Sequence, residues 1–357
     1  MDDRQGKASS RMPQRDPQAL DVRAVAAHLA QHGLQIDLSH GAHRLSGGLS
    51  NLNYLIHVDG RKAVLRRPPM GELPVGAHDM AREHTILSRL SRVWSPAPDS
   101  FFLCSDPSVI GAPFQLLECR TGLVLQGDKL PAALDTLESR RELSRELVAT
   151  LAGLHSVDAA GIGLGDFGRP DGFFERNVRG WLKRCAALEP DAAIASTVER
   201  IGDWLLSNQP GTLEPTLLHS DFKLDNCMLD ETLKVSTVLD WDMGTRGDPL
   251  MDLATLTSYW TEPGDPDCMQ RLGQMPTAHP GFFTRMQAVE AYAALTGRDV
   301  SGFGAWRILS LLKLGVIFMQ LHRNWVRGVA GDSRYAGFAD LGGEIVDFAA
   351  GSMARPI

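Results

Sequence analysis

The first third of the chain alternates short apolar runs with turn residues, which is the pattern of a small β-sheet. Two β-like runs, residues 54–58 and 63–66, are separated by Asp59 and Gly60, and an Asp-Gly pair in that position is a strong signal for a tight hairpin turn. Two more such runs follow at 101–104 and 114–118. We therefore expect a mostly antiparallel sheet in this part of the chain.

Two helices accompany the expected sheet. Asp21 can cap the N-terminus of the first, and Gly33 can end it. The second is predicted over residues 79–93, where apolar residues recur at helical spacing. Residues 1–20 are polar and contain no apolar core, so we interpret them as a flexible tail and place an N-terminal lobe at 21–118.

The rest of the chain is mostly helical in pattern. Long amphipathic or apolar runs occur at 135–155, 173–188, 192–207, 248–260, 282–295, 305–327 and 340–349. Short β-like runs lie among them at 217–218, 227–229 and 235–239. The fold class is therefore predicted as α+β, with a small antiparallel-sheet lobe followed by a larger, mostly helical lobe at 119–357. A crevice between two such lobes is a common place for a ligand.

Composition excludes several classes of protein. Apolar residues make up 43% of the chain and charged residues 22%, which is an ordinary globular mixture. The formal net charge is −7, whereas sequence-independent nucleic-acid binding needs a basic footprint. The five cysteines lie far apart and form no C-x-x-C pair, so we expect neither a disulfide framework nor a structural zinc site.

The longest apolar stretch, near residues 308–321, is interrupted by Lys313. It is shorter than the roughly 20 residues that cross a bilayer, so it predicts a buried helix. The polar first twenty residues do not read as a secretory signal. We expect a cytoplasmic protein with neither a membrane nor a nucleic-acid partner.

The strongest chemical signal is the segment 219–226, which fits the pattern H-x-D-x-x-x-x-N. Asp221 can orient an attacking hydroxyl and accept its proton, and the amide oxygen of Asn226 can bind a metal. Asp240 ends a β-like run, where its carboxylate would project rigidly, and Mg²⁺ prefers such oxygen ligands. Lys223 lies two residues after Asp221 and can offset the charge of a transferring phosphate. Together these residues point to phosphoryl transfer.

At this point the chain resembles the aminoglycoside phosphotransferase-like family, which is itself similar to protein kinases in fold. The resemblance covers about residues 35–330 and rests on the segments 47–51, 64–69, 219–226 and 239–253. Within the family, it is nearest to the branch found as the kinase-like domain fused to acyl-CoA dehydrogenases. The resemblance implies a two-lobed kinase-like fold with ATP and Mg²⁺ as cofactors.

The same resemblance implies roles for individual residues. Asp221 takes the position of the catalytic base, and Asn226 and Asp240 take those of the metal ligands. A glycine turn would fold over the phosphates, and the backbone that follows the sheet would meet the adenine. The residues at these nucleotide-binding positions are Gly47, Gly48, Ser50, Asn51, Glu118 and Arg120.

The third strand departs from the common kinase pattern, which has a lysine paired with a glutamate of the next helix. Here Arg66 and Arg67 stand at the end of the strand, and alternation sends them to opposite faces. We assign Arg66 to the lysine position and Glu83 as its partner. Arginine keeps the positive charge but replaces a compact ammonium with a planar fork.

Three further residues are interpreted as structural. His219 would organise the loop that carries Asp221, and Asp248 would support that loop. Asp252 would lie near a helix N-terminus, where a carboxylate is favoured.

The sequence predicts a phosphotransferase that moves the γ-phosphoryl group of ATP to the hydroxyl of a small molecule, in the nearer branch perhaps a hydroxyacyl-CoA. The alternatives are a nucleotide-binding regulator without catalysis and an aminoglycoside or choline kinase. Arg66 favours the regulator, whereas the complete set of Asp221, Lys223, Asn226 and Asp240 favours the enzyme. Oligomeric state and the choice between ATP and GTP stay open.

Overall fold

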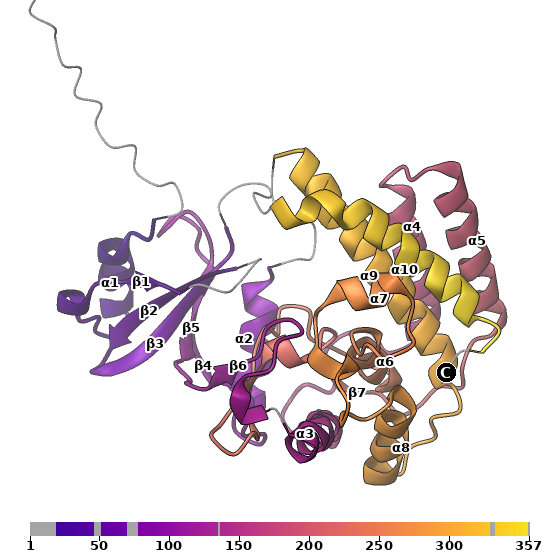
Figure 1. Ribbon diagram of the computed structural model, residues 1–357. Helices are drawn as coiled ribbons and strands as arrows, with labels where there is room; N and C mark the ends of the chain where they lie inside the picture. Colours follow the sequence, from indigo (N-terminus) through magenta and orange to yellow (C-terminus); the bar gives the residue numbers. More distant parts are fainter. Residues whose placement is uncertain (1–18, 46–50, 70–77, 135, 329–332, 356–357) are drawn as a thin grey trace, which may run out of the picture. The chain divides into compact units, whose positions relative to one another are not determined.

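The computed structural model describes residues 19–45, 51–69, 78–134, 136–328 and 333–355 (Figure 1). They fall into two compact units. The first contains the residues up to His84 together with Ser100–Cys119, and the second contains Thr85–Asp99 and the residues from Arg120 onward. The division passes through one helix, α2 (Met80–Leu90).

The first unit contains a five-stranded antiparallel sheet in the order β1-β2-β3-β5-β4 (Figure 1). Its strands are β1 (His43–Arg44), β2 (Leu52–Val58), β3 (Arg61–Arg67), β4 (Ser100–Cys104) and β5 (Phe114–Glu118). Helix α1 (Val22–Ala30) begins at Asp21, whose side chain accepts from the amide of Ala24. Its apolar side chains share one buried core with those of the sheet.

The predicted hairpin is confirmed. β2 and β3 pair from Leu52 opposite Arg67 to Val58 opposite Arg61. Between them Asp59 has φ +49° and Gly60 has φ +75°, the two left-handed residues of a tight type I′ connection. This register fixes which face of β3 each of its arginines occupies.

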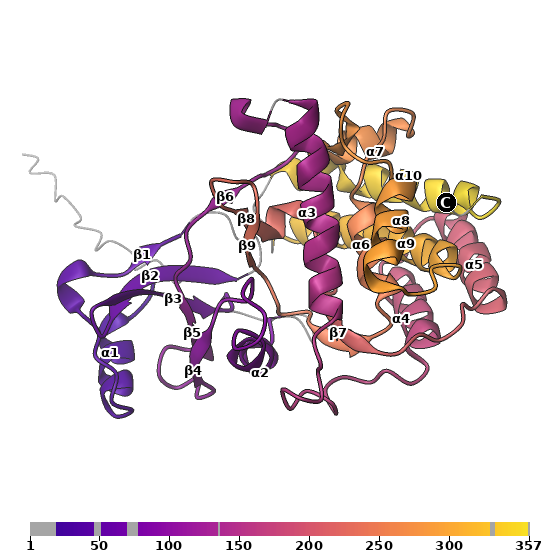
Figure 2. The same cartoon turned by 90° about the horizontal axis from the view of Figure 1, so that it is seen from below.

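The second unit is mostly helical, as predicted. Its long helices are α3 (Leu137–His155), α4 (Phe173–Ala186), α5 (Ala192–Ser207), α6 (Leu250–Ser258), α8 (Arg285–Thr296), α9 (Phe303–Val326) and α10 (Phe338–Ser352). The short α7 (Asp267–Leu272) was not predicted. Single turns of 3₁₀ helix occur at Leu38–His40, Ala132–Leu134, Leu224–Asn226, Pro276–Ala278 and Ser333–Gly337. α3 lies alongside α8 (Figures 1 and 2).

Two small antiparallel sheets complete the second unit. β7 (Thr216–Leu218) pairs with β10 (Thr245–Gly247), and β8 (Cys227–Leu229) pairs with both β6 (Leu123–Val124) and β9 (Val235–Val238). The chain crosses from one sheet to the other twice, once through residues 219–226 and once through 239–244. Because both crossings join the same two sheets, they lie side by side.

Helix α9 forms the core of the second unit. By length and composition it is the one helix of the described residues apolar enough to cross a membrane, but 83% of its most apolar stretch is buried inside the structure. It packs along α10 (Figure 1), and a Cβ added at Gly342 would lie 2.6 Å from the carbonyl oxygen of Gly315. The apolar run around Lys313 is therefore a buried helix, as predicted.

Candidate active site

The first crossing carries Asp221 and is held in an unusual backbone conformation. Ser220 has φ +69°, and Asp240 in the second crossing has φ +68°. Left-handed conformations are uncommon for residues other than glycine and persist only where the surroundings enforce them. Ser220 precedes the predicted catalytic residue Asp221, and Asp240 is itself a predicted metal ligand.

Three donors surround the carboxylate of Asp221. Lys223 Nζ lies 3.1 Å and Asn226 Nδ2 3.2 Å from Oδ2, and the hydroxyl of Tyr259 lies 3.3 Å from Oδ1. The Asp221 side chain is 21% exposed, so it can meet a substrate. Burial opposes its charge, but the ammonium groups of Lys223 and Lys313 outweigh burial and hold the pKa of Asp221 below its usual value.

Lys223 is held beside Asp221. Its Nζ also lies 3.9 Å from Asp225 Oδ1 and 4.8 Å from the centre of the Tyr259 ring. Burial disfavours the charged ammonium, yet Tyr259, Asp221 and Asp225 together raise the pKa of Lys223 well above its usual value. The side chain therefore supplies a fixed positive charge next to Asp221 at neutral pH.

Asn226 and Asp240 are brought together by the crossing segments. The amide of Leu239 donates to the carbonyl of Asn226 at 2.8 Å, which places Asp240 next to the loop end. Asn226 Nδ2 donates to the carbonyl of Asp221 at 2.9 Å, so the amide oxygen is the side-chain atom suited to a cation. Among the described residues, no three His, Cys, Asp or Glu side chains cluster as a metal cage. An amide and a carboxylate fit Mg²⁺, which takes few protein ligands alongside phosphate oxygens.

His219 joins the two crossings. Its ring is fully buried, Nε2 lies 2.8 Å from the carbonyl of Leu239, and Nδ1 accepts from the amide of Asp221 at 3.2 Å. These two bonds assign the proton to Nε2. Both ring nitrogens serve the backbone, so His219 organises the loop.

Asp252 lies in the first turn of α6, as predicted, and it is Asp252 and not Asp248 that supports the 219–226 loop. Asp252, fully buried in α6, accepts from the amides of His219 and Ser220, both at 2.7 Å. Asp248 instead accepts from the amide of Leu250 at 2.9 Å, at the N-terminus of α6. Asp252 therefore supports the loop that carries Asp221 from the first turn of α6, whereas the Asp248 carboxylate binds the first amide of that helix.

Lys313 is a supporting residue whose role the sequence did not predict. Its Nζ, buried in α9, donates to the carbonyl of Ser220 at 2.6 Å. Asp252 and Lys313 thus fix the peptide groups on both sides of the strained Ser220. The one signal in the sequence was a lysine inside an otherwise apolar run, since a buried charge needs a polar partner.

The first unit contains the Arg66–Glu83 ion pair. Arg66 Nε lies 2.8 Å from Glu83 Oε2, and both side chains are buried. Gln115 Nε2 donates to the same Glu83 oxygen at 2.6 Å, and Gln115 Oε1 accepts from Ser100 Oγ at 2.9 Å. Arg67 points elsewhere, with its guanidinium 5.9 Å from the centre of the Tyr54 ring. Gln115 was not predicted, although a glutamine inside an apolar strand was the available signal.

The other predicted nucleotide-binding residues lie in the first unit, in the second unit or outside the described residues. Gly47, Gly48 and Ser50 lie outside the described residues. Asn51 is buried, with Oδ1 2.8 Å from His78 Nδ1. Glu118 ends β5 opposite Ala63, whereas Arg120 belongs to the second unit.

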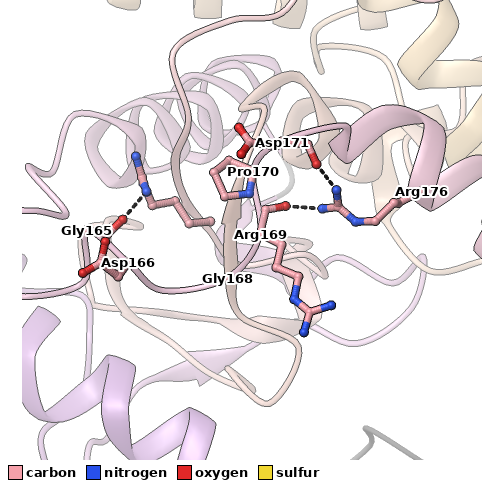
Figure 3. Close-up of a pocket in the computed structure, with 8 residues that line it drawn as sticks. Gly165, Asp166, Gly168, Arg169, Pro170, Asp171 and Arg176 are labelled. Carbon is pink, nitrogen blue, oxygen red and sulfur yellow. Dashed lines mark hydrogen bonds between the residues drawn. The ribbon is translucent and has the colours of Figure 1, made fainter.

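A hollow of about 430 Å³ in the second unit contains none of the predicted site residues (Figure 3). Its lining residues are Gly165, Asp166, Gly168, Arg169, Pro170, Asp171, Arg176 and Arg246. Arg176 donates to the carbonyls of Arg169 and Asp171, and Arg246 donates to that of Gly165. These guanidinium groups therefore shape the loop itself, and we do not assign the active site here.

The chain is similar to known phosphotransferases and to acyl-CoA dehydrogenase family members. The phosphotransferase enzyme family matches residues 41–288. Acyl-CoA dehydrogenase family member 11 of Rattus norvegicus is 29% identical over 316 residues, which cover 86% of this chain and 40% of the relative. Member 10 of Mus musculus is 38% identical over 210 residues, 58% of this chain and 19% of the relative. The chain thus spans at most about two fifths of the length of these relatives.

Solved structures show the same fold. A protein of Ralstonia eutropha, assigned provisionally to the aminoglycoside phosphotransferases, superposes with a TM-score of 0.75 at 24% identity, over 94% of this chain and 99% of that one. A mutant of aminoglycoside phosphotransferase APH(4)-Ia in complex with AMP-PNP and hygromycin B gives 0.60 at 17% identity, over 93% and 99%. The fold is therefore the kinase-like fold of these enzymes. Because the family match extends over residues 41–288, the chain belongs to the phosphotransferase enzyme family.

Proposed function

We propose that this protein transfers the γ-phosphoryl group of ATP, bound with Mg²⁺, to the hydroxyl of a small molecule. The observation that carries the proposal is the Asp221 carboxylate, fixed by Lys223 and Asn226 beside the segment of Asp240. Binding alone has little need of such a group, whereas phosphoryl transfer needs an oriented acceptor and neutralised charge.

In the proposed reaction the acceptor hydroxyl donates a hydrogen bond to Asp221. The hydroxyl oxygen forms the new bond to the γ-phosphorus, and the bond from that phosphorus to the bridging oxygen breaks. ADP leaves with the electron pair, and the hydroxyl proton passes to Asp221 and then to water. Asp221 thus serves as the general base, and its charge, which the lowered pKa maintains at neutral pH, also orients the hydroxyl.

The cation would be held by Asn226 and Asp240, and it would neutralise charge on the phosphates. Lys223 adds a positive charge from the protein on the same side as Asp221. In the first unit, Arg66 is held by Glu83 and would bind phosphate oxygens. We propose Gly47, Gly48, Ser50 and Asn51 as further nucleotide-binding residues. The AMP-PNP complex of the related fold supports ATP as the donor.

For the acceptor we propose a hydroxyacyl thioester of coenzyme A or a related anionic hydroxy acid. The two relatives described above are named as members of the acyl-CoA dehydrogenase family. An aminoglycoside is a polycation and needs an acidic groove, whereas α4 carries Arg179, Lys183 and Arg184 toward its C-terminal half. The hygromycin B complex makes aminoglycosides the comparison class for the test.

The test is a substrate panel with purified protein, radiolabelled ATP and Mg²⁺, read as label transferred to each compound. The panel contains hydroxyacyl-CoA thioesters, free hydroxy acids, hygromycin B and choline. We expect transfer to a hydroxyacyl compound and none without Mg²⁺. ATP binding without transfer to any compound or to water would instead identify a nucleotide-binding regulator.

A further inference from the structure

Tyr259 contacts both Asp221 and Lys223 of the 219–226 loop, although no sequence motif marks it. It follows the last turn of α6 and is 5% exposed. Its hydroxyl lies 3.3 Å from Asp221 Oδ1, and its ring centre lies 4.8 Å from Lys223 Nζ. One side chain therefore binds the carboxylate through its edge and the ammonium through its face.

The hydroxyl completes the set of donors on Asp221. Lys223 and Asn226 donate to Oδ2, whereas Tyr259 donates to Oδ1. A carboxylate held at one oxygen can still rotate about its Cβ–Cγ bond, and a donor on the second oxygen removes that freedom. A tyrosine hydroxyl is protonated at neutral pH, and burial raises the pKa of Tyr259 further, so the hydroxyl is available as a donor.

The ring acts on Lys223. An ammonium 4.8 Å from a ring centre lies within the range of a cation–π interaction, which strengthens where water is excluded. Lys223 is 15% exposed and Asp225 Oδ1 is 3.9 Å away. The ring thus contacts the ammonium that lies 3.1 Å from Asp221 Oδ2.

We propose that Tyr259 is a positioning residue for phosphoryl transfer, which fixes Asp221 through its hydroxyl and Lys223 through its ring. The inference rests on the proposed function of this site. Tyr259 makes two contributions that substitutions can separate. Tyr259→Phe keeps the ring and loses only the hydroxyl, whereas Tyr259→Leu loses both.

The decisive experiment is a double-mutant cycle between Tyr259→Phe and Asp221→Asn, measured as phosphoryl transfer from MgATP to the acceptor that the panel identifies, or to water. Tyr259→Phe is expected to lower kcat about tenfold, the scale of one hydrogen bond to a charged group, with KM for ATP within about twofold. In the Asp221→Asn background the same change should cost less than about twofold. A group that acts through Asp221 has no effect once Asp221 no longer functions.

Three further substitutions separate positioning from folding. Tyr259→Leu should lower kcat more than Tyr259→Phe, and Lys223→Met should remove that difference. Tyr335→Phe deletes a tyrosine hydroxyl elsewhere in the second unit and should leave kcat unchanged. Thermal unfolding of every variant reports the loss of stability independently of activity.

The outcomes distinguish this assignment from the proposed function. Suppose that the wild type transfers phosphate. If the Tyr259→Phe protein then has the same kcat, or if Tyr259→Phe lowers kcat by the same factor in the wild type and in Asp221→Asn, the positioning role is overturned and the proposed function stands. If the wild type transfers phosphate neither to an acceptor nor to water, the proposed function is overturned and this assignment with it.

Discussion

At the scale of the residue, the catalytic loop depends on groups that are far from it in sequence. Asp252 and Lys313 fix the peptides around Ser220, and Tyr259 completes the surroundings of Asp221. The motif itself could be predicted, because 219–226 carries its residue types at fixed spacing. Its support could not be predicted, since each contact joins residues more than thirty positions apart through packing.

Asp221→Asn should separate binding from transfer. The change is nearly isosteric and removes the negative charge that orients the hydroxyl, while Arg66, Asn226 and Asp240 remain. We expect phosphoryl transfer to fall by about 10²–10⁴, the usual scale for a general base, and MgATP affinity to stay within a few-fold. Calorimetry and turnover on the same preparations provide the measurement. Turnover equal to that of the wild type would remove Asp221 from the mechanism.

Substitutions at the two arginines of β3 should act on different properties. Arg66→Ala removes the charge and leaves Glu83 buried without it, so we expect weaker MgATP binding and a loss of stability of about 3–5 kcal/mol. Arg66→Lys keeps the charge and should retain part of the binding. Arg67→Ala, which removes a cation over the Tyr54 ring, should lower stability and leave MgATP affinity nearly unchanged. The opposite pattern of affinities would show that Arg67 binds the nucleotide.

At the scale of the element, local pattern predicted the long helices and the β2–β3 hairpin to within a few residues. The missed elements are β6, β10 and α7, which have two, three and six residues. Such short segments have little periodicity of their own, and β6 and β10 exist because β8 and β7 pair with them. Asp252 shows the same limit, because its place near the start of α6 could be predicted but its bonds to the loop depend on packing.

The close approach of α9 and α10 makes a prediction about stability. A Cβ at Gly342 would meet the carbonyl oxygen of Gly315 at 2.6 Å, a backbone atom that cannot move without shifting α9. Gly342→Ala should therefore destabilise the protein by about 1–3 kcal/mol, as overpacking does. Gly351→Ala lies in the same helix with open space around its Cβ, and should be neutral or slightly stabilising. Equal denaturant midpoints for the two variants would contradict this packing.

At the scale of the whole molecule, each unit contributes its own part of the proposed chemistry. The first unit holds Arg66 and Glu83, and the second holds Asp221, Asn226 and Asp240. The fold and the family were predicted correctly from four short segments. These segments do not identify the acceptor, because they carry the chemistry that is common to the family. The choice of acceptor depends on other surfaces of the protein, which differ from one family member to another.

Asp240→Ala should abolish the magnesium dependence of nucleotide binding without unfolding the protein. A ligand that binds only the folded state raises the unfolding temperature in proportion to the logarithm of its concentration over Kd. We expect MgATP to raise the unfolding temperature of the wild type more than ATP with excess chelator does, and Asp240→Ala to lose that difference together with turnover. Glu231→Ala removes the same charge from an exposed turn of the β8–β9 hairpin and should behave like the wild type. An Asp240→Ala protein that keeps both the magnesium-dependent shift and normal turnover would exclude Asp240 as a metal ligand.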